Sequence, residues 1–207
     1  MIYELRTYTL KPGMVPTYEE RFAEGLPFRA KYSKLAAFWH TDIGPLNQVI
    51  HLWPYESLQH RDEVRVAAAK DTSGKWPAKG DDALLRMESE ILLPAPFMRP
   101  LGEPQQLGSV YELRTYTYQV GAIPRVLELW SQAIGFREKF SPLAGCWYTE
   151  LGGLNRFFHL WPYKDLAARA QIREEAMKDP HWPPATREWL MSQENKLLVP
   201  AAFSPLH

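Results

Sequence analysis

The sequence lacks several features that would point to particular classes of protein. It has one cysteine, Cys146, in 207 residues, which excludes an internal disulfide and a cysteine-rich metal site and fits a reducing compartment. No apolar run approaches the roughly 20 residues that a membrane-spanning helix needs. Basic and acidic residues balance at 24 each, so no excess of positive charge is available to bind a phosphate backbone. We therefore expect no nucleic-acid partner and no membrane span.

Motifs for common chemistries are also missing. The sequence has no glycine-rich phosphate loop, no nucleophile elbow and no kinase signature. It has no His-x-His, His-x-x-x-His or Cys-x-x-Cys spacing, so we expect no metal site. A strand-like segment begins at residue 2, which leaves no room for a signal or transit peptide and makes a cytoplasmic location the expectation.

The sequence does contain an internal duplication. Residues 3–9, YELRTYT, recur as residues 111–117, and residues 51–55, HLWPY, recur as residues 159–163. Both matches have the offset 108, at which 70 consecutive positions align without a gap and 32 of them are identical. The offset then falls to 106, because the loop that follows is two residues longer in the first copy. Two units of this size predict a pseudo-two-fold axis rather than a solenoid.

The duplication sets the expected domain organisation. We predict a first repeat at residues 1–97, a linker rich in proline and glycine at residues 98–108, and a second repeat at residues 109–207.

Each repeat shows the same succession of strand and helix patterns. Residues 2–9 alternate as in a strand, and Gly13 and Pro16 then open a helix that should end or bend near Pro27. The remaining predicted elements are strands at 36–42 and 48–53 joined by a tight turn, a helix from the N-cap Ser57 (Asp165 in the copy) to about Lys70, and a strand at 85–93.

This βαββαβ order is the ferredoxin-like arrangement, in which helices cover only one face of a four-stranded sheet. The other face must be buried, and the second copy supplies an equivalent face. The expected fold class is therefore α+β, with two ferredoxin-like βαββαβ repeats forming an intramolecular dimeric α+β barrel. We also expect a cavity between the two sheets.

The motifs resemble those of the NIPSNAP family. The matching parts are the Tyr-Glu-Leu-Arg-x-Tyr opening, the strands of Trp39 and Trp147, the Gly-x-Leu-Asn hairpin and the His-Leu-Trp-x-Tyr segment. The helix pattern Leu-x-x-Arg-x-x-x-Arg at residues 58–65 and 166–173 matches as well. The resemblance implies a dimeric α+β barrel, which cofactor-independent monooxygenases, isomerases and haem-dependent peroxidase relatives share. It implies no particular reaction.

Strand alternation predicts which side chains share a face of the sheet. Glu4, Arg6 and Tyr8 share one face of the first strand, and His51 and Trp53 share one face of the third. If the more apolar faces meet the helices, these polar and aromatic side chains point into the barrel. Their copies are Glu112, Arg114, Tyr116, His159 and Trp161. On the second strand, alternation leaves open whether Trp39 and Thr41 or Phe38 and His40 face inward.

A mixed polar and aromatic interior is typical of a small-molecule pocket. In the catalytic interpretation, His51 or His159 is a general base, Glu4 or Glu112 orients it or shares its proton, and Arg6 or Arg114 stabilises an anion. In the structural interpretation, the Glu and Arg side chains are paired charges that fix the sheet faces together. The predicted substrate-binding residues are Arg6, Arg114, Tyr8, Tyr116, His40, Tyr148, Trp53 and Trp161.

Three further features allow more than one interpretation. His40 has Tyr148 as its counterpart, which marks either a functional asymmetry or a neutral exchange. Arg61 and Arg65 form either an anion or partner site or a helix face paired with acids such as Asp62 or Glu88. The loop tryptophans, Trp76 and Trp182, belong either to the core, to a cap over the barrel mouth or to an oligomer interface.

The sequence thus supports two functions. In the first, the protein binds a small organic molecule between the repeats and acts as a cofactor-independent monooxygenase-like or isomerase-like enzyme. In the second, it is a non-enzymatic module that assembles, for example as a homo-oligomer, through its outer helices and Trp loops. No cofactor is predicted; the one alternative is a haem held by His51 or His159.

Overall fold

The computed structural model describes residues 1–70, 72 and 74–207, and its order of elements confirms the predicted duplication. Asp71 and Ser73, beside and within the predicted loop insertion, lie outside the described residues. The first repeat contains β1 (Ile2–Leu10), α1 (Val15–Arg29), β2 (Ala37–Ile43), β3 (Gln48–Tyr55), α2 (Leu58–Ala69) and β4 (Leu84–Pro94). The second contains β5 (Val110–Tyr118), α3 (Ile123–Arg137), β6 (Gly145–Leu151), β7 (Arg156–Tyr163), α4 (Leu166–Ala176), a short 3-10 helix (Arg187–Trp189) and β8 (Leu190–Pro200).

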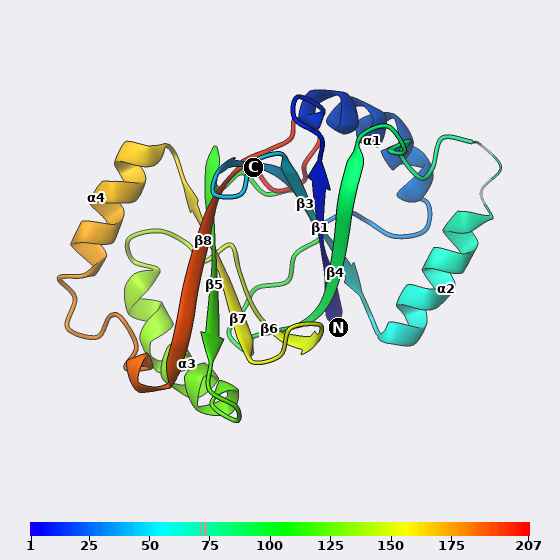
Figure 1. Ribbon diagram of the computed structural model, residues 1–207. Coiled ribbons are helices and arrows are strands. Elements are labelled where there is room, and N and C mark those ends of the chain that lie inside the picture. Colours follow the sequence, from blue (N-terminus) through cyan, green and yellow to red (C-terminus); the bar gives the residue numbers. More distant parts are fainter. Residues whose placement is uncertain (71, 73) are drawn as a thin grey trace.

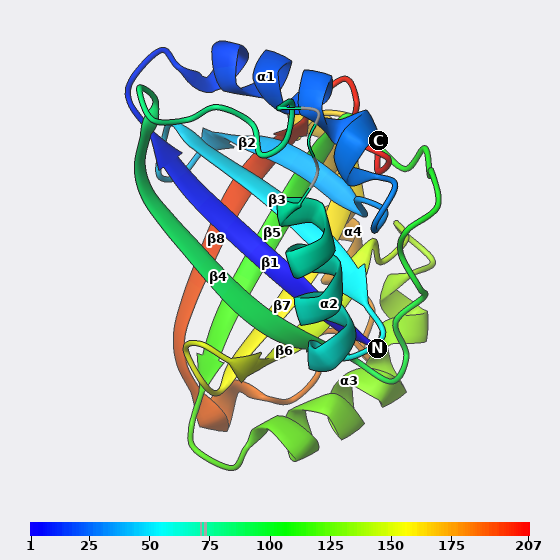
Figure 2. The ribbon, with the colours of Figure 1, turned by 90° about the vertical axis from the view of Figure 1, so that its right-hand side faces the viewer.

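The strands close into one barrel with the order β1-β3-β2-β8-β5-β7-β6-β4. The pairs β2–β8 and β4–β6 join the two repeats, and the neighbouring strands in the barrel are antiparallel. Figure 1 shows the helices on the two outer sides, with α1 and α2 beside the first repeat and α3 and α4 beside the second. Figure 2, turned by 90°, shows α2 in front of the strands and α1 along the top of the view. The predicted dimeric α+β barrel is therefore confirmed.

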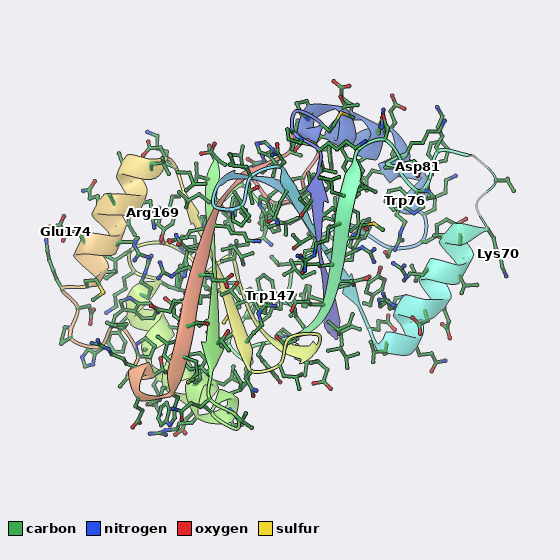
Figure 3. The ribbon with its side chains drawn as sticks, viewed as in Figure 1. Lys70, Trp76, Asp81, Trp147, Arg169 and Glu174 are labelled. Carbon is green, nitrogen blue, oxygen red and sulfur yellow. The ribbon has the colours of Figure 1, made fainter. Side chains whose placement is uncertain are left out.

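The barrel interior is filled by apolar side chains. Leu5 and Leu52 of the first repeat meet Leu113 and Leu160 of the second, and Trp147 lies between the two halves in Figure 3. The void among these side chains measures only about 10 Å³. The expected ligand cavity between the two sheets is thus absent among the described residues, and that expectation was wrong.

The prediction of which residues share a strand face holds, but the face assigned to the interior was wrong. Tyr3 and Leu5 point into the barrel, whereas Glu4, Arg6 and their strand neighbours lie beneath the helices. A closed sheet offers its interior no helix or water to satisfy polar groups, so that side needs the more apolar face. On β2 the interior residue is Trp39, while Phe38 lies on the helix side.

The helices begin as the sequence predicts. The side chain of Ser57 accepts a hydrogen bond from the backbone N–H of His60, and Asp165 accepts one from Ala168, so both are N-caps. The first helix ends before the next strand, as predicted: α1 ends at Arg29, with Pro27 in its last turn. Arg29 donates a hydrogen bond to the Tyr55 hydroxyl on β3. No helix of the described residues is long and apolar enough to cross a membrane.

The segments that follow β4 and β8 cross to the opposite repeat. Phe203, after β8, stacks on Phe22 of α1 with ring centroids 5.6 Å apart. After β4, the N–H of Ala95 donates to the carbonyl of Cys146, and Phe97 packs among the core residues of the second repeat. Each helix–sheet layer therefore contains an aromatic ring from the other repeat, which ties the two units together.

Candidate functional site

Each repeat has a pocket between its helices and the outer face of its sheet. The pocket of the second repeat has a volume of about 400 Å³, and that of the first repeat about 230 Å³. We call them the second pocket and the first pocket. Each is built on a cross-strand pair, Arg114 opposite His159 and Arg6 opposite His51, which places both side chains on the same face.

Aromatic rings form the walls of the second pocket. Trp182 stands edge-on to Trp130 and Trp161, with ring centroids 5.2 and 6.0 Å away. Tyr116 and Tyr163 complete the aromatic lining. In the first repeat, Trp76 has the corresponding place, beneath α1 in Figure 3. The loop tryptophans thus cover the helix–sheet pockets and do not cap the barrel mouth.

The histidine of each pocket is held as a neutral hydrogen-bond donor. The indole N–H of Trp53 donates to Nδ1 of His51 at 2.6 Å, and Trp161 donates to His159 in the same way at 2.7 Å. An indole nitrogen can only donate, so the histidine proton must be on Nε2. Burial and the charge of Arg6 lower the pKa of His51 to about 3, and burial with the charge of Arg114 lowers the pKa of His159 well below its usual range. Each Nε2 is buried and has no hydrogen-bond partner among the described residues.

A second arginine in each pocket is buried without a carboxylate. Arg137, only 3% exposed, donates to the hydroxyls of Ser141 at 3.0 Å and Tyr163 at 3.3 Å, and it lies over the ring of Trp161 at 4.2 Å. Arg29, 4% exposed, donates to the Tyr55 hydroxyl at 2.9 Å. Neither forms a salt bridge within the described part of the chain. Burial lowers the pKa of both groups, although a guanidinium stays charged at neutral pH.

The glutamates beside the pockets are already neutralised. Oε1 of Glu4 accepts hydrogen bonds at 2.7 Å each from Arg6 on its own strand, Arg61 on α2 and Ser89 on β4. Burial alone would raise the pKa of Glu4, but the hydrogen bond from Arg61 and the charge of Arg6 outweigh it and hold the pKa at about 2.

Glu112 repeats the arrangement. It accepts from Arg114 at 2.8 Å, from Arg169 at 2.7 Å and from Arg173 at 3.3 Å. Figure 3 shows Arg169 on the side of α4 that faces the sheet and Glu174 on the outer side. The paired charges therefore anchor α2 and α4 to the sheet, whereas the structural interpretation placed them between the two sheets.

The structure brings most of the predicted site residues together, but outside the barrel. The first pocket is lined by Glu4, Arg6, Tyr8, His51 and Trp53, and the second by Arg114, Tyr116, His159 and Trp161. Glu112 lies behind the second pocket and does not line it.

His40 and Tyr148 line neither pocket. His40 Nδ1 contacts Oε1 of Glu19 on α1 at 2.8 Å, and Tyr148 packs against the core of its own repeat. Arg61 binds Glu4 and Asp62, whereas Glu88 pairs with Arg86, so the salt-bridged interpretation of the helix holds with a different main partner.

The sequence interpretation missed Arg29 and Arg137. Their signal was the dipeptide Phe-Arg, which occurs at residues 28–29 and again at 136–137 at the offset of the duplication. The predicted helix end or bend near Pro27 gave no indication that the Arg29 side chain reaches the sheet.

The hydrogen bonds at His51 and His159 do not fit a haem ligand. The described residues contain no group of three or more His, Cys, Asp or Glu side chains that could hold a metal. A histidine that binds haem iron uses the Nε2 lone pair, but here the Trp N–H at Nδ1 fixes a proton on Nε2. The haem alternative therefore conflicts with the geometry of His51 and His159.

Comparison with known proteins gives a consistent family assignment. The family model NIPSNAP matches residues 3–99 and 111–205. Protein NipSnap homolog 3A of Homo sapiens is 35% identical over 216 residues, which cover 100% of this chain and 86% of that protein. Protein NipSnap homolog of Dictyostelium discoideum is 33% identical over 205 residues, which cover 96% of this chain and 87% of that protein.

Solved structures share the whole fold at low sequence identity. The crystal structure of a candidate monooxygenase from Fusobacterium nucleatum has a TM-score of 0.68 and 12% identity, and the match covers 97% of this chain and 92% of that one. At this identity the likeness concerns the fold alone.

Proposed function

This chain belongs to the NIPSNAP family, and we propose that it binds small organic anions with a flat apolar body in the pockets between its helices and its sheet. The observation that carries the proposal is Arg137, a buried guanidinium that lines the second pocket and lacks a carboxylate among the described residues. Because an unpaired buried charge destabilises a protein, its presence is best explained by a ligand that supplies the opposite charge.

The charge of the lining favours an anion over a cation. Aromatic pockets can hold a cation against their ring faces. Four arginines line the second pocket, however, and none of its described lining residues is acidic. A ligand cation would be repelled there, whereas a carboxylate would be attracted and could form two parallel hydrogen bonds with one guanidinium.

The remaining polar group also suits an anion. The Nε2–H of His159 is a buried donor without a partner among the described residues, and it lies in the same pocket as Arg137. A ligand carboxylate oxygen would satisfy both donors, and the rings of Trp161 and Trp182 would pack on its apolar body.

Binding has more support than proton-transfer catalysis. The proposed general base, His51 or His159, carries its proton on Nε2 and has its Nδ1 occupied, so neither nitrogen has a free lone pair. Glu4 is a weak base because its pKa is held at about 2. The groups present can stabilise a negative charge, but the described lining of the second pocket contains no carboxylate, no lysine and no histidine with a free lone pair to create one by proton abstraction.

The assembly alternative loses part of its basis. Trp76 and Trp182 pack against rings inside their own repeats, at 5.3 Å from Phe22 and 5.2 Å from Trp130. They therefore do not extend from the surface as partner-binding groups, and only the outer helices remain for that role.

The test compares three ligands of the same shape and different charge by thermal shift and calorimetry. 2-Naphthoate should raise the melting temperature and bind, 2-naphthamide should bind at least tenfold more weakly, and 2-naphthylmethylammonium should not bind. Arg137→Met should remove the stronger 2-naphthoate site, because it keeps the size of the side chain and removes the charge.

The matched control is Arg125→Met, which removes an exposed arginine paired with Glu128 on the same helix. It should leave the binding of 2-naphthoate unchanged. Equal binding of the anion and the amide, or unaltered binding to Arg137→Met, would contradict the proposal.

A further inference from the structure

The two pockets differ in their charged groups although their frameworks are duplicated. Arg114 and Arg173 of the second pocket pair with Glu112, as Arg6 and Arg65 of the first pocket contact Glu4. The difference is at the rim. Arg187 lines the second pocket, is exposed and forms no ion pair with a described residue. At the offset of 106 its counterpart is the acidic residue Asp81, which does not line the first pocket.

The second pocket therefore has two lining arginines, one buried and one exposed, that pair with no carboxylate of the described residues. Arg137 is buried at 3% exposure and Arg187 is exposed, yet both line the same cavity of about 400 Å³. The described lining of the first pocket has one such cation, Arg29. Two separated positive charges match a ligand with a negative charge at each end.

The pockets also differ in size and in their lining. Tyr18 of α1 lines the first pocket, and its ring stands edge-on to Tyr8 with centroids 6.3 Å apart. Its counterpart in the second repeat is Val126, which is buried and does not line the pocket. The second pocket, which is the larger, has room for a longer ligand.

We infer that the two pockets take different ligand classes: the second pocket binds a flat organic dianion that spans from Arg137 to Arg187, and the first binds a shorter monoanion. This inference rests on the proposed function, because it assumes that the buried arginines hold ligand anions. It adds that one chain binds one dianion, in the second repeat only.

The test is isothermal titration calorimetry of the full chain with 2-naphthoate and with naphthalene-2,6-dicarboxylate. The dicarboxylate should bind at one site per chain and at least tenfold more tightly than 2-naphthoate. In Arg187→Gln the dicarboxylate and 2-naphthoate should bind with about equal affinity, instead of a ratio of tenfold or more, since this variant loses only the contact to the second carboxylate. Arg137→Met should abolish the site.

The variant Tyr18→Val tests whether the size of the first pocket or its number of cations prevents the dicarboxylate from binding there. This variant widens the first pocket without adding a cation, so the dicarboxylate should still bind at one site per chain. Two equal sites for the dicarboxylate in the wild type, or an unchanged preference in Arg187→Gln, would overturn the inference while leaving the proposed function in place. If neither 2-naphthoate nor the dicarboxylate bound, the proposed function itself would fail, and the inference with it.

Discussion

The two faces of the sheet alternate along the same strands but differ in what they can do. The inner face carries Leu5, Leu52 and their copies, and it closes around a void of about 10 Å³. The outer face carries ionised groups, neutral histidines and two pockets of about 230 and 400 Å³. The second repeat closes the interior of the barrel. On the outer face, side chains of the helices form hydrogen bonds and ion pairs with the polar groups of the sheet, so these groups can be buried there. Function is therefore expected outside the barrel, at one site per repeat.

The largest expected effect concerns the charge clusters of the outer face. Glu4→Gln and Glu112→Gln should each lower the free energy of unfolding by about 3–5 kcal/mol, because each removes a fully buried carboxylate from its partly buried arginine partners. Urea denaturation at neutral pH measures the change. Glu128→Gln is the matched control, since its exposed pair with Arg125 should contribute less than about 1 kcal/mol.

The same clusters predict an acid limit. The pKa of Glu4 is held at about 2, below its ordinary value, so its stabilisation is complete above about pH 4.3 and is lost as the pH falls toward 2. A wild type and a Glu4→Gln variant with parallel stability curves between pH 4.5 and 2 would contradict the paired-charge account.

The inner face should respond to loss of volume and not to ligand. Leu52→Ala and Leu160→Ala should each destabilise the protein by about 2–5 kcal/mol, since both side chains are fully buried in the barrel. Calorimetry should show the affinity for 2-naphthoate within twofold of the wild type. Loss of binding without unfolding would place the ligand in the barrel interior and break the comparison.

A smaller effect, of opposite sign, is expected at Arg137. If the side chain exists to bind an anion, Arg137→Met should leave the stability of the ligand-free protein unchanged or raise it by about 1 kcal/mol. A fold-stabilising role predicts a loss of several kcal/mol instead. Thermal and urea denaturation without ligand distinguish the two roles.

The smallest effect concerns His40, which contacts Glu19 at 2.8 Å and has Asp42 nearby. The hydrogen bond that His40 donates to the Glu19 carboxylate raises the pKa of His40 above its ordinary value. This contribution is therefore complete below about pH 6.5 and is lost as the pH rises through the higher folded value. His40→Tyr, which copies Tyr148, should remove a pH dependence of a few tenths of a kcal/mol between pH 6 and 8. An unchanged pH dependence in the variant would show that the pair contributes nothing.

The fold, and which residues share each face of a strand, could be predicted from the sequence. Strand alternation and the constant repeat offset of 108 allow few other arrangements. It was not sufficient for the direction of those faces. Glu4 and Arg6 look like interior residues of a ligand cavity until Arg61 is seen to reach Glu4 from α2. The duplicated arginines of that helix were the available signal that the partners of Glu4 are helical.

The chemistry of the histidines could not be predicted either. His51 and Trp53 are two residues apart on one strand face, but only the side-chain rotamers bring the indole N–H to Nδ1. That single contact changes the histidine from a candidate base into a donor. The pocket linings likewise differ at Tyr18 and Val126, which occupy the same place in the alignment, because only Tyr18 lines its pocket.

The most direct test of where this protein binds its ligand is the anomalous bromine signal in crystals soaked with 6-bromo-2-naphthoate. The account predicts a bromine peak in the pocket between α3, α4 and the sheet, with the carboxylate against Arg137, and no peak inside the barrel. A peak in the barrel interior, or no peak in either pocket at a concentration that saturates the protein in solution, would contradict it.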